Sequence, residues 1–160
     1  LWAQLAMDDV IAGLEPMVEK YGDHGIRTAL GFWRKAFPAS GPKQMIEAMM
    51  ERDRLLRLWQ LFLEERPLIL THSSAELPFK VGLDLVDVPT TERIIRAQST
   101  ELAVPVLGLP SIAVPTGVVD GVPVGVQLIA NRYREDLCLE AAEAIEARAG
   151  LRTPVDPFVS

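Results

Sequence analysis

A histidine, two serines and a glutamate fall within six residues of one another in the segment THSSAE, residues 71–76. These residue types supply the nucleophile, the base and the orienting carboxylate of many hydrolases. Successive side chains at a strand end point to opposite faces, however, so neighbours in sequence rarely form a triad, which is assembled in space. We therefore interpret the segment as a loop with capping hydroxyls, and keep an autonomous hydrolase built on His72 and Ser73 as the weakest alternative.

The remaining reactive side chains also favour structural roles. Cys138 lies near an expected helix start, where a thiolate is favoured, but it stands between two leucines with no histidine nearby, which indicates a packed thiol. His24 precedes a glycine in an expected turn and is interpreted as a solvated loop residue. Two histidines and one cysteine, widely spaced, cannot make a specific zinc site, so we expect no metal and no cofactor.

Two apolar runs joined by Asp120-Gly121 form the most informative stretch of the chain. A two-residue type I′ turn needs a positive φ at both central positions, which Asp-Gly tolerates, so the sequence predicts a hairpin of strands 111–119 and 122–130. Few positions in either run suit water, and we expect both faces of the hairpin to be covered. Such a hairpin belongs inside a larger sheet.

Prolines and glycines interrupt both strands of this predicted hairpin. Pro115 and Pro123 each lack a ladder donor, so each should lie at a strand start, a bulge or an unpaired position. Gly117 and Gly125 indicate close approach of two backbones.

Helices are predicted on both sides of the strands in sequence. Apolar residues at steps of three and four predict a helix through residue 21 that Pro16 kinks or divides, and a second over 26–37. A third begins at Pro42 and ends before Pro67. Negative charge at residues 135 and 136 opens a last helix, which Gly150 ends.

Between the third helix and the hairpin, residues 68–70 predict a short buried strand. A connection over 73–89 follows, and Thr90 or Thr91 is expected to cap a helix through about residue 102, which Pro105 prevents from continuing. These elements predict the α/β class, with a mixed sheet, a buried β-hairpin covered by helices, and a helical amino-terminal part.

Three stretches resemble one known family. GLPSIAVPTG (108–117), DGVPVGVQLI (120–129) and REDL (134–137) are similar to the carboxy-terminal segment of the amidase signature family. RDRLLRLW (52–59) with PLILT (67–71) resembles the helix and strand that precede that segment in some amidases, so the resemblance covers about two thirds of the chain.

The resemblance implies part of a larger amidase signature fold, in which a serine, a cis-serine and a lysine hydrolyse amides. Those residues belong to a Gly-Ser-Ser-Gly-rich core that this sequence lacks, so we expect a fragment that is itself inactive and assign no catalytic residue. In similar amidases the strand end at His72 and Ser73 approaches the substrate pocket, and the resemblance implies that Gly108, Leu109 and Pro110 line it as well.

Two positions depart from the family pattern. His72 stands where many members have proline, and Pro105 stands where many have asparagine, three residues before the Gly-Leu-Pro. Because of the second departure, the resemblance does not support a pocket contact at Pro105.

Composition limits the partners of this chain. A net charge of −6 without a cluster of lysine and arginine argues against nucleic acid or an anionic membrane surface. One cysteine suits a reducing compartment, and no apolar run is long enough to cross a membrane, so we expect a cytoplasmic protein. A small-molecule amide is the expected substrate of the intact enzyme. The sequence leaves open whether the protein forms a homo-oligomer.

We expect residues 1–160 to form a single incomplete domain, mainly helical over 1–66, α/β over 67–150 and extended over 151–160. Covering three strands on both faces leaves open sheet edges unless more chain exists. The leading hypothesis is therefore the carboxy-terminal part of an amidase, either a hydrolase or one component of an amidotransferase. The alternative is a non-catalytic truncated product that self-associates or binds a partner through its exposed sheet edge or apolar helix faces.

Overall fold

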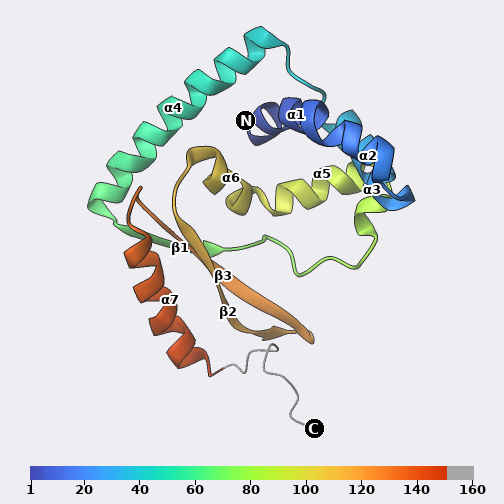
Figure 1. The fold of residues 1–160 in the computed structure, drawn as a ribbon. Coiled ribbons are helices and arrows are strands. Elements are labelled where there is room, and N and C mark those ends of the chain that lie inside the picture. The colour runs from blue at the N-terminus through green and yellow to red at the C-terminus, as the bar shows by residue number, and fades with distance from the viewer. Residues whose placement is uncertain (151–160) are drawn as a thin grey trace.

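The computed structural model describes residues 1–150, and the extended tail expected over 151–160 lies outside the described residues. Figure 1 shows a small sheet with helices on both sides. The helices are α1 (Trp2–Asp9), α2 (Glu15–Tyr21), α3 (His24–Ala36), α4 (Pro42–Glu65), α5 (Val88–Ala97), α6 (Ser99–Leu107) and α7 (Glu135–Ala149), with a π-helical turn at Val10–Leu14 and a 3₁₀ turn at Leu83–Leu85. The strands are β1 (Leu68–His72), β2 (Ser111–Val119) and β3 (Val122–Ala130).

The amino-terminal helices follow the apolar periodicity of the sequence. Pro16 divides the first helix as predicted: the π-helical turn precedes it, and the proline lies in the first turn of α2, where its missing N–H has no partner to lose. His24 is exposed as expected, but it begins α3 rather than occupying a turn, because the Asp23 carboxylate accepts a hydrogen bond from the Ile26 amide at 2.9 Å and caps the helix.

The three strands form one antiparallel sheet in the order β1-β3-β2. Leu68 pairs with Ala130 and His72 with Val126, while Ser111 pairs with Ile129. The α/β class is therefore confirmed. Within the described residues every strand pair is antiparallel, whereas the sequence predicted a mixed sheet, because nothing in a short apolar run specifies the direction of its neighbour.

The hairpin has the bounds predicted from its turn. Asp120 and Gly121 both have positive φ, 50° and 79°, as a type I′ turn requires. The register shifts between Pro115 and Gly117, which places that proline at a bulge. Close backbone approach is confirmed at Gly125, where a Cβ would lie 2.6 Å from the Val114 carbonyl oxygen. The same expectation is wrong for Gly117, where a Cβ would meet no atom within 4 Å.

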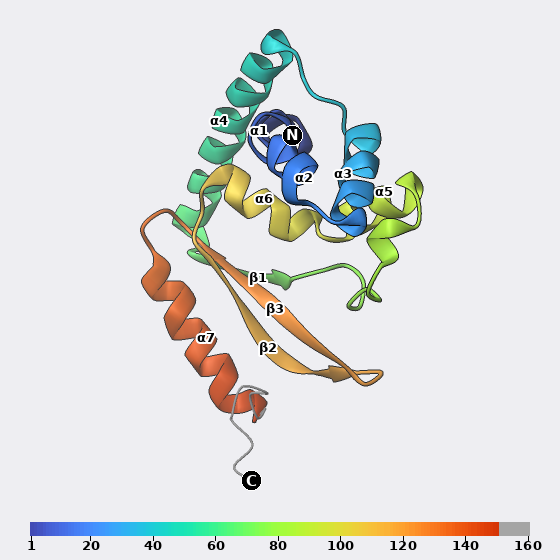
Figure 2. The same cartoon turned by 45° about the vertical axis from the view of Figure 1, so that its right-hand side comes forward.

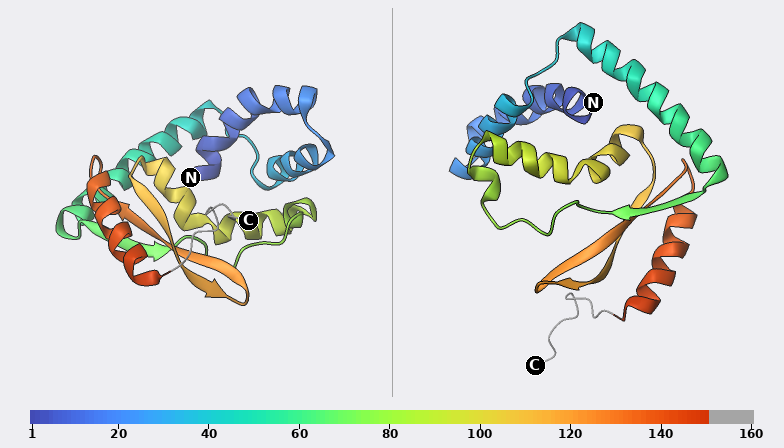
Figure 3. Two further views of the ribbon diagram at one scale, coloured as in Figure 1. Left: turned by 60° about the horizontal axis from the view of Figure 1, so that its bottom comes forward. Right: turned by 180° about the vertical axis from the view of Figure 1, so that it is seen from behind.

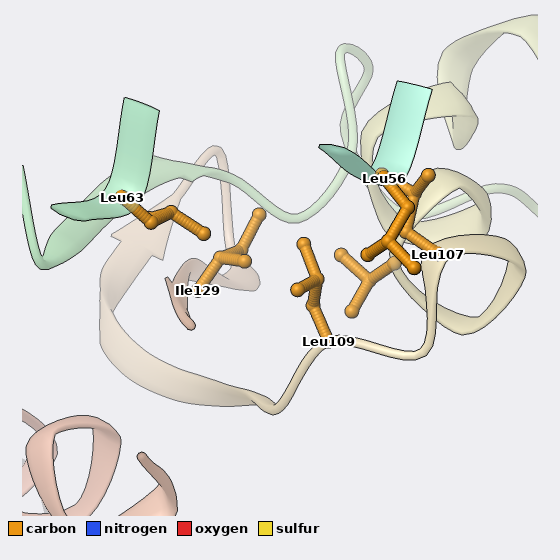
Figure 4. Packing of buried hydrophobic residues seen from close by; sticks show 6 residues of the cluster. Leu56, Leu63, Leu107, Leu109 and Ile129 are labelled. Carbon is orange, nitrogen blue, oxygen red and sulfur yellow. The ribbon is translucent and has the colours of Figure 1, made fainter. Parts of the chain in front are cut away.

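Side chains alternate between two apolar clusters on opposite faces of the sheet. Val114 and Leu128 pack against Ala142 of α7 on one face. On the other face, Figure 4 shows Ile129 with Leu56 and Leu63 of α4, Leu107 of α6 and Leu109, which follows α6. Val104 of α6 belongs to the same cluster. Figure 2 shows α7 lying along the hairpin, whose tip projects beyond the helices. Both faces are thus covered at the base of the hairpin, whereas Val118 and Val119 at its tip are exposed.

The segment between β1 and β2 departs from the prediction in three ways. Leu70 of β1 is 60% exposed rather than buried, because β1 is an edge strand. Asp87, not a threonine, caps α5 by accepting a hydrogen bond from the Thr90 amide at 2.8 Å. A second helix, α6, contains Pro105 and ends only at Gly108, whose φ of 64° is left-handed. Among the described residues, no helix is long and apolar enough to cross a membrane.

Candidate functional site

The carboxyl end of β1 meets the first turn of α6. The Thr100 hydroxyl lies 3.2 Å from the His72 carbonyl oxygen and 3.3 Å from His72 Nδ1. A carbonyl oxygen only accepts, so Thr100 donates to it, and both contacts are satisfied when Nδ1–H donates to the threonine oxygen. That tautomer leaves Nε2 of the exposed His72 ring as a hydrogen-bond acceptor.

An apolar hollow of about 230 Å³ extends from this point along α6. Its polar side chains are Thr71, Ser99 and Thr100, which lie where β1 ends and α6 begins. The other lining residues are apolar: Trp59, Ile69, Ala103, Val104, Leu107, Leu109 and Ile129. A pocket with hydroxyls at one end and apolar side chains along the rest can orient the polar group of a ligand and bury its apolar part.

A second hollow, of about 270 Å³, lies beyond the end of β1 and is more polar. Ser73, Ser74 and Gln98 border it, together with Gly125 of β3. The Ser73 hydroxyl oxygen is buried without a hydrogen-bond partner among the described residues. A buried hydroxyl without a partner is costly, so this atom is suited to a water molecule or a ligand group.

The Glu76 carboxylate fixes the loop that borders the second hollow. Arg93 Nε of α5 donates to Glu76 Oε1 at 2.9 Å, and the Ser74 hydroxyl accepts from the Glu76 amide at 3.2 Å. The hydrogen bond from the Arg93 guanidinium lowers the pKa of the Glu76 carboxyl. This carboxylate is therefore engaged with α5 and does not orient His72, so THSSAE does not form a triad.

Gln127 occupies the middle of the sheet, on the same face as its pairing partner Thr71. Its side chain is 4% exposed, and its Nε2 donates to the Ser111 hydroxyl at 3.4 Å. Oε1 of the same amide has no partner within residues 1–150. Sequence reasoning missed this residue, although an amide in an otherwise apolar strand is a signal that could have identified it.

The structure does not gather all five predicted pocket residues in one place. His72 and Ser73 lie at the carboxyl end of β1, whereas residues 108–110 precede β2 at the opposite end of the sheet. Leu109 lines the apolar hollow from that side. Pro110 has a structural contact, since its carbonyl oxygen accepts from the Ala130 amide at 3.1 Å.

Gly108 ends α6 beneath two arginine side chains. Arg52 Nε donates to the Val106 carbonyl oxygen at 2.6 Å, and Arg132 Nη2 to that of Leu107 at 3.5 Å. Both guanidinium groups thus satisfy carbonyls that the helix end leaves free, and their positive charge suits the negative end of the helix dipole. This contact fixes the end of α6 that lies away from His72.

Neither a metal site nor a reactive thiol is found in the part of the chain that the structure describes. No three histidine, cysteine or acidic side chains in residues 1–150 are close enough to hold a metal ion. Cys138 is 3% exposed, as expected of a packed thiol, and burial raises its pKa, with a further contribution from the Glu135 charge.

Comparison with known proteins places this arrangement in a family. The family model described as Amidase matches residues 18–139. An indoleacetamide hydrolase from Bradyrhizobium japonicum is 34% identical over 151 residues, covering 94% of this chain and 32% of that protein. The A subunit of the glutamyl-tRNA(Gln) amidotransferase from Archaeoglobus fulgidus is 32% identical over 108 residues, covering 68% of this chain and 23% of that protein.

The fold agrees with this match. The crystal structure of the A subunit of glutamyl-tRNA(Gln) amidotransferase from Thermotoga maritima superimposes with a TM-score of 0.60 at 25% identity, over 88% of this chain and 29% of that one. The chain therefore spans about a third or less of the length of these relatives. On the matched residues and the shared fold, this chain belongs to the amidase family, the amidase signature enzymes.

Proposed function

We propose that this chain is the carboxy-terminal segment of a serine amide hydrolase with a preference for amides of apolar, aromatic acids. The observation that carries the proposal is the apolar hollow beside β1, with Thr71, Ser99 and Thr100 at its polar end. Relatives of this chain include indoleacetamide hydrolases, whose names describe an amide with an aromatic acyl part. In the intact enzyme the hollow holds the acyl group, and the hydroxyls face the amide.

The chemistry itself is assigned to residues outside this sequence. A serine oxygen bonds to the amide carbon and the C–N bond breaks, so that ammonia or an amine leaves with the proton that a lysine and a cis-serine relay. Water then hydrolyses the acyl-enzyme. This sequence has no Gly-Ser-Ser-Gly run to supply those groups, which supports an inactive segment that forms one incomplete domain.

The open edge of β1 supports the same proposal. Leu70 is 60% exposed on an edge strand, and an apolar edge without a neighbour is unfavourable for a protein that acts alone. We propose that this edge pairs with the portion of the enzyme that carries the serine. The single cysteine, Cys138, is buried and unpaired, which suits a cytoplasmic enzyme.

A chimera tests the proposal directly. The 160-residue chain alone should release no ammonia from indole-3-acetamide, whereas the Bradyrhizobium japonicum hydrolase with this chain in place of its matching segment should be active. A folded but inactive chimera would contradict the assignment. Turnover by the isolated chain that is lost in Ser73→Ala would instead establish an autonomous hydrolase.

The acyl pocket has its own pair of variants in the chimera. Ala103→Leu narrows the apolar hollow and should raise KM for indole-3-acetamide by about tenfold, which corresponds to roughly 1.4 kcal/mol, while KM for acetamide stays the same. Ala144→Leu makes the same change at an exposed position of α7 and should alter neither value. If Ala103→Leu raised KM equally for both substrates, the hollow would not be the acyl site.

The alternative, a non-catalytic module that self-associates or binds a partner, is supported by the same open edge of β1. It predicts a defined oligomer of the isolated chain together with a chimera that never gains activity.

A further inference from the structure

We propose that Gln127 of β3 binds the amide nitrogen of the substrate: its side-chain oxygen, Oε1, accepts a hydrogen bond from the N–H of the amide that is cleaved. This inference rests on the proposed function, because it takes the apolar hollow beside β1 as the site of the acyl group. Gln127 then makes the site selective for amides over esters, since an ester has no N–H to donate.

Gln127 is a costly residue at its position in the sheet. It lies in β3 between Val126 and Leu128 and is 4% exposed. The hydrogen bond from its Nε2 to the Ser111 hydroxyl is long, at 3.4 Å, and its Oε1 has no partner among residues 1–150. A buried carboxamide with an unsatisfied oxygen destabilises the fold, whereas a methionine of similar size would not. The contact with Ser111 alone therefore does not explain a glutamine here.

Gln127 lies on the strip of the sheet that separates the two hollows. Thr71, directly opposite on β1, lines the apolar hollow, as does Ile129, two residues further along β3. Gly125, two residues before Gln127, borders the second hollow together with Ser73. Residues two apart in a strand share a face, so this strip belongs to the face that α6 covers. Figure 3 shows α6 and α7 on opposite sides of the sheet.

The unsatisfied polar atoms of the described chain gather at this strip. Within residues 1–150, the buried side-chain atoms without a hydrogen-bond partner are Oε1 of Gln127 and the hydroxyl oxygen of Ser73. Gln127 stands between the two hollows, and Ser73 borders the second one. Buried polar atoms in folded proteins are nearly always satisfied, so two exceptions in one place indicate that a ligand supplies the missing partners.

The chemistry of Oε1 selects the group that binds it. A carboxamide oxygen only accepts hydrogen bonds, so its partner must be a donor, and the donor in an amide is the nitrogen. When the acyl part fills the apolar hollow, the nitrogen lies on the other side of the carbonyl carbon, toward Gln127 and the second hollow. The second hollow then receives the ammonia or amine that leaves, and the Ser73 hydroxyl binds it there.

Kinetics of the chimera test this role of Gln127. Gln127→Met keeps the length of the side chain and removes the acceptor. The value of kcat/KM for indole-3-acetamide should fall by about tenfold or more, whereas that for methyl indole-3-acetate, an ester, should change by less than about twofold. Gln44→Met makes the same change at an exposed position of α4 and should alter neither value.

A parallel loss of both activities in Gln127→Met would give this residue a purely structural role and overturn the proposal. Unchanged hydrolysis of the amide would overturn it as well. Because the ester does not need the acceptor, its turnover also reports whether the variant is folded.

Nuclear magnetic resonance of the isolated, ¹⁵N-labelled chain gives a test that does not depend on catalysis. The side-chain amide signals of Gln127 should shift when indole-3-acetamide is added and should stay in place with methyl indole-3-acetate, while those of the exposed Gln44 respond to neither. Signals of Gln127 that ignore the amide would mean that a trapped water satisfies Oε1, which overturns the proposal.

The two tests separate this inference from the proposed function. A shift of the Gln127 signals together with an inactive chimera would support the amide contact and contradict the assignment of the chain as a working segment of the hydrolase. An active chimera whose ratio of amide to ester turnover is the same in Gln127→Met would contradict the role of Gln127 alone.

Discussion

The carboxyl end of β3, here called the closed end, lies between two layers of helices, whereas the carboxyl end of the edge strand β1, here called the open end, is exposed. Leu128, Ile129 and Ala130 are at most 3% exposed, since α7 covers one face and α4 with α6 the other. Leu70 pairs with Leu128 but is exposed because β1 is the edge strand, and His72 at the end of β1 is exposed as well. The closed end therefore supplies the burial that stabilises the sheet, whereas the open end keeps the His72 imidazole accessible.

The largest effect should follow a cavity at the closed end. Leu128→Ala removes a side chain that is 1% exposed and should lower the free energy of unfolding by about 2–5 kcal/mol, measured by urea denaturation. Leu139→Ala removes the same atoms from an exposed position and should cost less than about 0.5 kcal/mol. Similar losses from both would mean that the Leu128 side chain is not packed more tightly than an exposed leucine.

Substitutions at two glycines test how closely β2 and β3 pack between the closed end and the hairpin tip. Gly125→Ala should cost about 1–3 kcal/mol, because its Cβ would lie 2.6 Å from the Val114 carbonyl oxygen and the backbone must move. Gly117→Ala lies across the same bulge in open space and should change stability little. Thermal unfolding of the two variants separates these outcomes, and a reversed order would contradict the register.

Acid should loosen the open end before the closed end. Hydrogen bonds from Arg93 lower the pKa of Glu76, and those from Thr90 lower the pKa of Asp87. A carboxyl whose pKa is lower in the folded state stabilises that state above its unfolded value, near 4, and this stabilisation is lost as pH falls through the folded value. Amide exchange over residues 73–91 should therefore become less protected at about pH 3 than at about pH 6, relative to β3. An equal loss of amide protection over residues 73–91 and in β3 would contradict this prediction.

The smallest effect is expected at the exposed edge. Leu70→Lys should change the free energy of unfolding of the isolated chain by less than about 0.5 kcal/mol, because the side chain is already in water. In the chimera the same substitution should lower the yield of folded enzyme, since the edge is then paired. A large loss of stability in the isolated chain would show that the edge is covered after all.

The β2–β3 hairpin, which includes the closed end, was also the part that sequence reasoning predicted well. Asp120-Gly121 dictates a local turn geometry, and a two-residue turn fixes the register of both strands, so their bounds followed directly. The exposure of Leu70 did not follow, because a short apolar run gives no information on whether its neighbours are present.

Helix limits near Pro105 were mispredicted for a different reason. Proline disfavours a helix interior, but this residue is exposed in the last turns of α6, where burial of Val104 and Leu107 outweighs the loss of one backbone hydrogen bond. The site contacts of Thr100 and Gln98 were missed because they depend on α6 lying against the end of β1, which no local pattern specifies.

The fixed end of α6 has a consequence for the two hollows that lie near its other end. Arg52 and Arg132 anchor this helix at Gly108, whereas its first turn borders the apolar hollow and Gln98, just before it, borders the second hollow. Substitutions around Ser99 would therefore change the walls of the hollows without removing the arginine contacts that hold the other end of α6.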